Sequence, residues 1–395
     1  MPGPLEGVKV IDLTTVVLGP FATQILAELG AEVIKVESRE GDNMRHPGPM
    51  KHPGMGYMFL ALNRGKRGIV LDLKHPDGLG AMKRLIAQAD VLIYNVRPQA
   101  MARLGLSWQD VSAINPRLLY VGTYGYSQKG PYAAKAAYDD LIQGASGLPW
   151  VVSQTSDAPN YAPVNFADRV TGLHAVYTVT AALFQRSRSG KGQSIEVPMF
   201  ESISQFVLGD HLAGLSWMEP MGGAGYQRLL ARRPYQTADG YLCVLVYNDK
   251  QWRSFLDAIG EPERMRDSRY ATQASRAANI HDIYAYLAEL FRTCSTEAWI
   301  KLLEKADIPV SRMNSIDDVV HDAHLNESGF FYAEDHPSEG RMRAMRTPTS
   351  WGDTPTGTPG PAPRLGEHSA QVLREAGYSD TEIEAMTRTG ATFLG

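Results

Sequence analysis

The first 125 residues alternate short apolar runs with amphipathic stretches, and this alternation limits the fold more than any other feature of the chain. Residues 8–13 and 32–37 have the pattern of strands, and residues 21–29 between them have the pattern of a helix. The alternation continues with strands at 68–73, 91–95 and 117–125 and helices at 78–89 and 108–114. Strands joined by helices pair in parallel, so we predict an α/β fold with a Rossmann-like, doubly wound sheet.

The chain is long enough for a second domain, because single cores rarely grow beyond about 250–300 residues and this chain has 395. The pattern after residue 210 changes to one strand at 242–247 and helices around 250–259, 280–292 and 296–306. We predict five segments: 1–200 as the first part of the large domain, 201–225 as a linker, 226–325 as a small α+β domain, 326–365 as an extended Pro-rich linker, and 366–395 as C-terminal helices that return to the large domain.

Composition excludes several classes of protein. A net charge of −4 and a pI of about 6.2 offer no basic surface for nucleic acid. No run of 18 apolar residues and no signal-peptide pattern occur, which predicts a soluble, cytoplasmic protein with no membrane partner. Cys243 and Cys294 stand alone, and His321 and His324 have no carboxylate pair at metal spacing, so we expect neither a disulfide nor a metal site.

Asp168 is the most informative single residue, because it stands at the start of an apolar stretch. Apolar residues recur at helical spacing over 170–184 without a proline, which predicts a buried helix that begins just after Asp168. The positive end of a helix favours an ionised carboxylate, and such a carboxylate can attack an acyl carbon. Aspartate is also a preferred N-cap residue. The residues alone therefore leave both a capping and a nucleophilic role open.

Three common catalytic and nucleotide-binding motifs are missing. The first turn, Val17-Leu18-Gly19-Pro20, has one glycine, whereas a dinucleotide-binding turn has three, although Glu37 stands where a ribose-binding acid would lie. Neither a Walker sequence nor a Gly-x-Ser-x-Gly elbow occurs. A dehydrogenase, a P-loop enzyme and a serine hydrolase are therefore not indicated.

Short motifs in a fixed order cover nearly the whole chain. They include Lys9-Val10-Ile11-Asp12-Leu13, Leu29-Gly30-Ala31-Glu32-Val33, Asn63-Arg64-Gly65-Lys66-Arg67, Asn95-Val96-Arg97-Pro98, Tyr138-Asp139, Ala167-Asp168 and Gly190-Lys191-Gly192-Gln193. In this order they resemble the class III coenzyme A transferases, a family that includes formyl-CoA:oxalate transferase and carnitine CoA transferase. Each motif alone would be weak, but their number and order make the resemblance specific.

The resemblance implies an enzyme that moves CoA from an acyl-CoA donor, such as succinyl-CoA, to a free carboxylic acid, including dicarboxylates. It assigns Asp168 as the nucleophile, which would form mixed anhydrides and an aspartyl-CoA thioester. It also implies an interlocked homodimer and no tightly bound cofactor, with coenzyme A and acyl-CoA as substrates. The alternatives are an α-methylacyl-CoA racemase or intramolecular CoA transferase of the same family, and a nucleotide-binding module without catalysis.

Tyr138 favours the transferase over the racemase. Racemase members of the family have a histidine before the aspartate that corresponds to Asp139, and a tyrosine with a pKa of about 10 is a poor base at pH 7. We therefore expect Tyr138 to be an active-site neighbour. Val17 stands where oxalate-specific members have glutamine, which argues against oxalate as the acceptor.

Further site residues follow from the resemblance alone. It implies CoA contacts from Leu71, Lys74, Asn95, Val96 and Arg103, and less directly from Arg39, because Ser38 stands where several members have arginine. The small residues Gly222, Gly223, Ala224 and Gly225 are predicted to form either a lid over the site or a plain hinge. The roles of Arg228, Arg232 and Arg233 stay open, with the distal carboxylate of a dicarboxylic acid as one candidate ligand.

Overall fold

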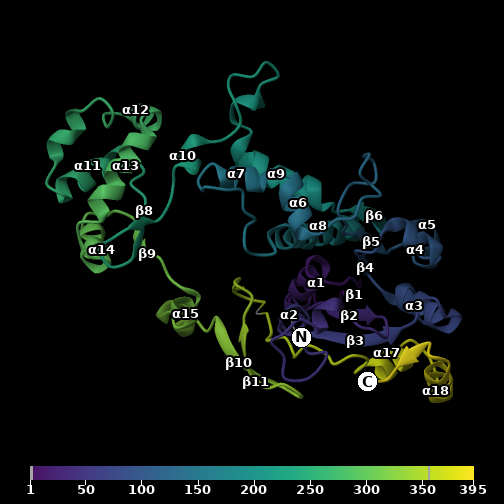
Figure 1. The fold of residues 1–395 in the computed structure, drawn as a ribbon. Helices are drawn as coiled ribbons and strands as arrows, with labels where there is room; N and C mark the ends of the chain where they lie inside the picture. The colour runs from purple at the N-terminus through teal and green to yellow at the C-terminus, as the bar shows by residue number, and fades with distance from the viewer. Residues whose placement is uncertain (1–2, 355) are drawn as a thin grey trace. The chain divides into compact units, whose positions relative to one another are not determined.

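The computed structural model describes residues 3–354 and 356–395, which form two compact units (Figure 1). The large unit contains residues 3–149, Asn160–Val207 and Glu327–Gly395. The small unit contains Trp150–Pro159 and Leu208–Asn326. Within the described residues, no helix combines the length and the apolar character needed to cross a membrane.

A seven-stranded sheet forms the centre of the large unit. Its strands are β1 (Lys9–Leu13), β2 (Glu32–Glu37), β3 (Lys66–Leu71), β4 (Val91–Tyr94), β5 (Leu119–Gly122), β6 (Gln193–Glu196) and β12 (Thr392–Phe393). The order is β12-β3-β2-β1-β4-β5-β6, and all pairs are parallel except β12 with β3. The predicted large parallel-sheet domain is confirmed. The strand order reverses between β1 and β4, and such a switch point opens a crevice at the carboxyl ends of the strands.

Helices cover both faces of this sheet, because successive side chains of a strand point to opposite faces. Val10 packs with α1 (Leu18–Glu28) and α8 (Phe166–Ser189). Its neighbour Ile11 packs with α3 (Pro76–Gln88), α17 (Ser369–Glu375) and α18 (Asp380–Thr389) on the other face. The other helices that begin in this unit are α2 (Tyr57–Leu62), α4 (Pro98–Arg103), α5 (Trp108–Ile114), α6 (Asp139–Ala145), α7 (Leu148–Ser153) and α9 (Met199–His211).

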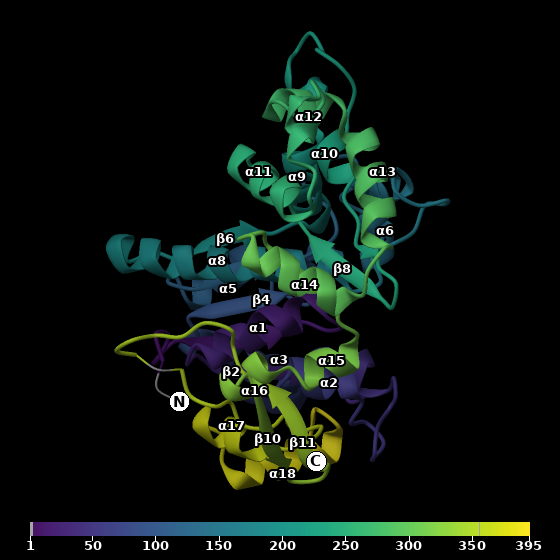
Figure 2. The same cartoon turned by 90° about the vertical axis from the view of Figure 1, so that its left-hand side faces the viewer.

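The small unit has a short antiparallel sheet and its own aromatic core. The sheet order is β7 (Tyr235–Gln236), β8 (Tyr241–Val244) and β9 (Val310–Arg312). Its main helices, α11 (Asp249–Ala258), α13 (Ile280–Phe291) and α14 (Thr296–Lys305), lie around β8 (Figure 2). The shorter helices are α10 (Gln227–Leu230), α12 (Gln273–Ala278), α15 (Ile316–Val320) and α16 (Ala323–Glu327). Trp252, Phe255, Phe291 and Trp299 are buried together and form the centre of this core.

The two predicted linkers contain more regular structure than expected. Helix α9 continues to His211, inside the range 201–225, because its apolar residues Ile203 and Val207 are buried. The range 326–365 contains an antiparallel hairpin, β10 (Phe331–His336) and β11 (Gly340–Met345), where we expected an extended connector. Gly340 adopts a φ of +74° at the turn, which permits the tight reversal. The prediction of an extended linker followed the proline-rich composition of residues 354–363 and missed this short hairpin.

Candidate active site

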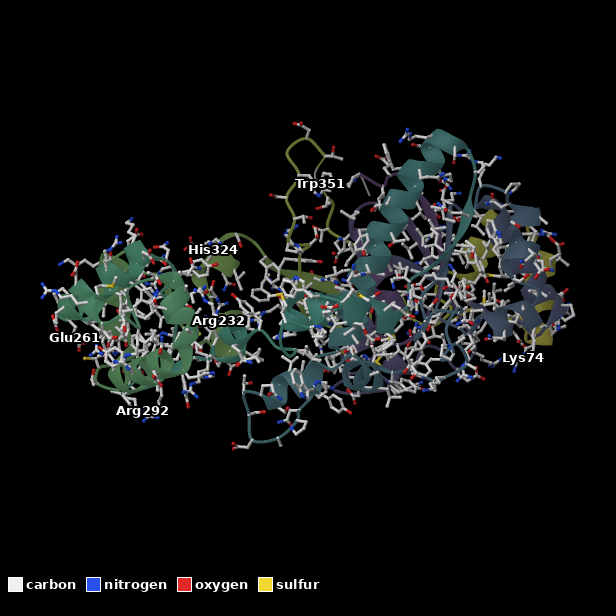
Figure 3. The ribbon with its side chains drawn as sticks, turned by 90° about the horizontal axis from the view of Figure 1, so that it is seen from above. Lys74, Arg232, Glu261, Arg292, His324 and Trp351 are labelled. Atoms are coloured by element: carbon white, nitrogen blue, oxygen red, sulfur yellow. The ribbon has the colours of Figure 1, made fainter. Side chains whose placement is uncertain are left out.

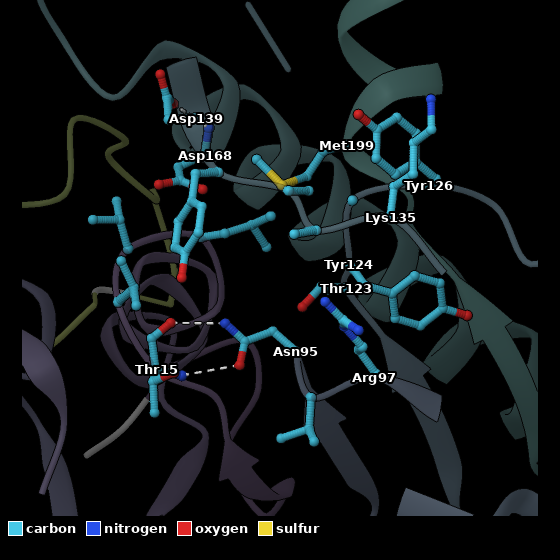
Figure 4. A pocket seen from close by; sticks show the side chains of 18 of the residues that line it. Thr15, Asn95, Arg97, Thr123, Tyr124, Tyr126, Lys135, Asp139, Asp168 and Met199 are labelled. Carbon is cyan, nitrogen blue, oxygen red and sulfur yellow. Dashed lines mark hydrogen bonds between the residues drawn. The ribbon is translucent and has the colours of Figure 1, made fainter. Parts of the chain in front are cut away.

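A cavity of about 330 Å³ opens at the switch point of the large sheet (Figure 4). Three loops line it: residues 15–18 follow β1, residues 95–98 follow β4, and residues 123–126 follow β5. Tyr138, Asp139 and Asp168 also line it. The cavity therefore lies at the position where doubly wound sheets bind their ligands.

Asp168 lies in the first turn of α8 but is not its N-cap. The helix begins at Phe166, with Asn165 at the N-cap position, so the predicted start after Asp168 is wrong. The N-cap side chain makes no capping bond, and instead Asp139 Oδ1 accepts a hydrogen bond from the backbone N–H of Asp168 at 2.9 Å. A carboxylate from another helix thus satisfies an N–H group of the first turn. Local sequence cannot reveal a cap that comes from 29 residues away.

Helix α8 is buried on one face only, whereas we expected it to be buried throughout. Ala175 and Val179 pack in the core, but Leu173, Tyr177 and Phe184 are 50%, 56% and 67% exposed. These three residues share one face, because they are 4 and 11 positions apart on a helix with 3.6 residues per turn. We call this face the α8 apolar stripe.

The surroundings of Asp168 disfavour its charged form. Burial and, next, the negative charge of Asp139 raise the pKa of Asp168 from 3.8 to about 7, while Arg169 acts in the opposite direction. Gln143 Nε2 donates to Asp139 Oδ2 at 2.6 Å, so the neighbouring carboxylate is held in place. Near neutral pH the protonated and ionised forms of Asp168 are therefore both populated. A site that favours an uncharged carboxyl also favours a carboxyl converted into an ester or anhydride.

A glycine allows α8 to approach α1 closely beside the cavity. A Cβ atom at Gly172 would lie 3.0 Å from the carbonyl oxygen of Leu18 and 2.9 Å from Cδ1 of Phe21. Such distances are too short for a normal contact, so only glycine fits without a shift of one helix. Gly172 is one turn after Asp168. The position of the candidate nucleophile is therefore coupled to the first turn of α1.

A network of buried charges lies next to the loop after β1. Asp12 binds Lys66 at 3.0 Å, and Lys35 binds Asp42 at 2.9 Å, with all four side chains fully buried. Burial would raise the pKa of Asp12, but Lys66, Lys35 and two hydroxyl groups lower it to about 2. Burial lowers the pKa of Lys66 to about 8, although Asp12 opposes this shift. We did not predict this network; the available signal was a charged residue in each of three buried strands, Asp12 in β1, Lys35 in β2 and Lys66 in β3.

The structure brings some of the predicted site residues together and leaves others apart. Val17, Asn95, Val96 and Tyr138 line the cavity with Asp168. Leu71 is buried in the core of the sheet, and Lys74, Arg103 and Arg39 are exposed outside the cavity lining. Figure 3 shows Lys74 at the surface of the large unit.

Two basic residues of the cavity were missed. Arg97 and Lys135 both line it, and both are exposed. Arg97 belongs to the motif Asn95-Val96-Arg97-Pro98, so its place in the loop that follows a buried strand was a usable signal. Guanidinium and ammonium groups at the mouth of a cavity suit a phosphate-bearing ligand.

The predicted lid and the three arginines without an assigned role, Arg228, Arg232 and Arg233, lie in the small unit. The glycine loop folds onto its own unit: Gly223 O accepts from Gly214 N at 3.1 Å, and Gly225 N donates to His211 O at 2.8 Å. Arg228 stacks over the ring of Tyr247 at 4.4 Å. Arg232, labelled in Figure 3, and Arg233 line a separate cavity of about 310 Å³ with Trp252 and other apolar residues.

The fold and the cavity define a doubly wound α/β protein with a carboxylate pair at the switch point of its sheet. The family model described as CoA-transferase family III matches residues 5–369, and the chain belongs to this family. The predicted membership of the class III CoA transferases is thereby confirmed, and with it the prediction of a transferase.

Relatives and solved structures agree with this assignment. A succinate–glutarate CoA-transferase from Agrobacterium fabrum is 34% identical, over 98% of this chain and 97% of the relative. A formyl-CoA:oxalate CoA-transferase from Shigella sonnei is 32% identical, over 99% of this chain and 100% of the relative. The crystal structure of a CAIB/BAIF family protein from Brucella suis has a TM-score of 0.81 at 32% identity and covers 95% of this chain and 100% of that one.

Proposed function

We propose that the enzyme moves CoA from an acyl-CoA donor to a free carboxylic acid, with Asp168 as the covalent nucleophile. The observation that carries this proposal is the environment of Asp168, which lines the cavity with a pKa raised to about 7. A carboxylate held in a partly dry site is a stronger nucleophile than one in water, and its acylated form carries no charge. The same surroundings therefore favour both the attack and the intermediate.

The proposed reaction has four balanced steps. The Asp168 carboxylate attacks the thioester carbonyl of the donor and releases the CoA thiolate, which leaves a mixed anhydride. The thiolate then attacks the carbonyl carbon of Asp168, which gives an aspartyl-CoA thioester and the free donor acid. The acceptor carboxylate attacks this thioester, displaces the CoA thiolate and forms a second anhydride. The thiolate finally attacks the acceptor carbonyl, releases the new acyl-CoA and regenerates Asp168.

A trapping experiment tests the nucleophile. Hydroxylamine added during turnover with succinyl-CoA should convert Asp168 alone into its hydroxamate, which peptide mass spectrometry identifies. Asp168→Ala should abolish both trapping and transfer. Asp140→Ala is the matched control, because Asp140 is also an aspartate near the site but is exposed and does not line the cavity. Full transferase activity in Asp168→Ala would end the proposal.

For the substrates we propose succinyl-CoA as donor and a dicarboxylic acid as acceptor. Support comes from relatives that are 31–34% identical and are named as transferases between succinate or succinyl-CoA and glutarate. A matrix of acyl-CoA donors and free acids, read by mass spectrometry, tests this choice. Preferred transfer to a monocarboxylic acid would refute the dicarboxylate assignment and leave the transferase assignment intact.

An assay with (2R)- and (2S)-methylacyl-CoA in deuterated water separates a transferase from a racemase. Racemisation needs a base on each side of the α-carbon. Tyr138 is 68% exposed and Asp139 is occupied by bonds to Asp168 and Gln143, so we infer that Asp168 has no competent second base. Interconversion of (2R)- and (2S)-methylacyl-CoA with deuterium uptake, without transfer of CoA to any acid, would favour a racemase over a transferase.

We further propose that the enzyme is an interlocked homodimer. The α8 apolar stripe supports this, because large exposed apolar residues on one helix face are typical of an interaction surface. Interlocked subunits cannot separate while they stay folded. Sedimentation at nanomolar concentration should therefore show a dimer, and a folded monomer would contradict the interlocked arrangement.

A further inference from the structure

Four consecutive main-chain groups in the loop after β1 are each hydrogen-bonded to a side chain from another segment. Lys35 Nζ donates to Thr14 O at 2.9 Å. Asn95 brackets Thr15, since Oδ1 accepts from Thr15 N at 3.1 Å and Nδ2 donates to Thr15 O at 2.7 Å (Figure 4). Asp42 Oδ1 accepts from Val16 N at 3.1 Å. We call Lys35, Asp42 and Asn95 the loop clamp.

The loop clamp holds an unfavourable backbone conformation. Val16 has a φ of +72°, in the left-handed region that β-branched residues rarely adopt. Two other non-glycine residues of the described chain, Ala213 and Asp307, have positive φ, but neither is β-branched and neither lines the cavity. A strained residue persists only where its surroundings fix it, and such residues gather at functional sites.

The clamp is itself fixed by buried charges. Lys35 and Asp42 are fully buried and 2.9 Å apart, and Glu37 accepts a hydrogen bond from the backbone N–H of Asp42 at 2.8 Å. Arg45 pairs with Glu37 at 2.7 Å, also in the interior. Buried ion pairs are an inefficient source of stability compared with apolar packing. Their concentration beside one strained loop is better explained by the geometry that they impose.

This loop forms the wall next to Asp168. Val16, Val17 and Leu18 line the cavity together with Asp168. The carbonyl of Leu18 also lies where a side chain at position 172, one turn after Asp168, would clash. A change in the loop would therefore displace both the cavity wall and the helix that carries the nucleophile.

We propose that Lys35 and Asp42 are positioning residues for the transfer reaction, which hold Val16 in its left-handed conformation and thereby set the cavity wall that faces Asp168. Both residues are buried and outside the cavity lining, so they act through the loop and not on the substrate. The inference rests on the proposed function for its kinetic test. It extends that function to two residues that do not line the cavity.

Two substitutions of Val16 test the conformational claim while the side chains of Lys35 and Asp42 stay in place. Glycine adopts a positive φ freely, whereas proline is restricted to a φ near −65° and has no N–H for Asp42. The kcat/KM of Val16→Pro should be at least about tenfold below that of Val16→Gly, because small displacements near reacting groups cost orders of magnitude in rate. Circular dichroism should show both variants folded. Equal kcat/KM in the two variants would overturn the proposal.

The second test removes the charge that holds the loop. Asp42→Asn should lower kcat/KM by roughly 10–100-fold, and Val16→Gly added to Asp42→Asn should restore part of the loss, because glycine needs less restraint at this φ. Glu28→Gln is the matched control: it breaks the buried pair of Glu28 with Arg64, 3.0 Å apart, outside the cavity lining. This control should lower the melting temperature and leave kcat/KM unchanged.

A purely structural role predicts a different outcome. Asp42→Asn and Glu28→Gln would then lose activity only in proportion to the unfolded fraction, and Val16→Gly would restore nothing. If the wild-type enzyme transferred CoA from none of the tested donors, the proposed function would fail and the loop clamp would not be refuted by that result. Calorimetric binding of coenzyme A would then replace the kinetics, with weaker binding expected for Val16→Pro than for Val16→Gly and equal binding counting against the clamp.

Discussion

Replacement of Asp139 by asparagine should lower the pH at which the enzyme becomes active. The pKa of Asp168, raised from 3.8 to about 7, corresponds to about 4 kcal/mol against the ionised form. Burial is the larger cause and the charge of Asp139 the second. The charge of Asp139 is the smaller of the two causes that raise this pKa, so we assign to it about 1–2 kcal/mol of this free energy. Asp139→Asn should therefore bring the pKa of Asp168 from about 7 to about 6.

The assay is the pH dependence of kcat/KM for CoA transfer. An ionised nucleophile gives a rate that rises with pH through the pKa of Asp168, so the midpoint of the acid limb should fall by about one pH unit in the variant. Asparagine keeps an oxygen that can accept from the Asp168 N–H, although its amide no longer suits Gln143. Asp140→Asn is the control, because Asp140 is exposed in the same helix turn. An unmoved midpoint in Asp139→Asn, or an equal shift in both variants, would refute the electrostatic reasoning.

Three further predictions follow from burial and packing. Because the pKa of Asp168 is about 7 in the folded state and about 4 in the unfolded state, the free energy of unfolding should fall by roughly 2–4 kcal/mol as pH rises from about 4 to about 7, and Asp168→Asn should remove this fall in urea titrations. Gly172→Ala should cost about 1–3 kcal/mol by overpacking against Leu18 and also reduce kcat, whereas Gly144→Ala, in an open helical position, should stabilise by up to about 1 kcal/mol. Asp12→Ala should cost about 3–5 kcal/mol, because it leaves Lys66 and Lys35 buried without this partner; chemical denaturation measures the loss, and a change below 1 kcal/mol would contradict it.

The sequence predicted the large unit well because its signals are local and strong. The run at 91–94 is apolar on both faces, which is the pattern of a parallel strand covered by two helix layers, and the run at 32–37 has apolar residues on both faces at Val33, Ile34 and Val36. The motif order singled out Asp168 as the candidate nucleophile, although the helix begins two residues before it. Its cavity then follows from the switch point between β1 and β4, a property of strand order that no local pattern contains.

Other parts of the structure depend on partners that are distant in sequence. Strand β12 is two residues long and exists because Thr392 and Phe393 pair with Leu71 and Val70. The cap on the Asp168 N–H comes from Asp139, and the bonds that shape the loop at Val16 come from Lys35, Asp42 and Asn95. The sequence shows that Lys35 is a charged residue within a strand, but it does not show that this residue restrains the loop at Val16.

The pairing of β12 with β3 has a consequence for synthesis on the ribosome. Residues 66–71 emerge early, yet their edge partner at 392–393 follows more than 300 residues later, and nearly all of the small unit is made in between. The small unit, apart from Trp150–Pro159, is continuous over 208–326, so its core can assemble while the large sheet still has an unpaired edge. An unpaired edge strand invites contact with other chains. Several chains translated from one mRNA would expose the unpaired edge of β3 while they are close to one another. Misassembly should therefore be most frequent before residue 392 of each chain has been made.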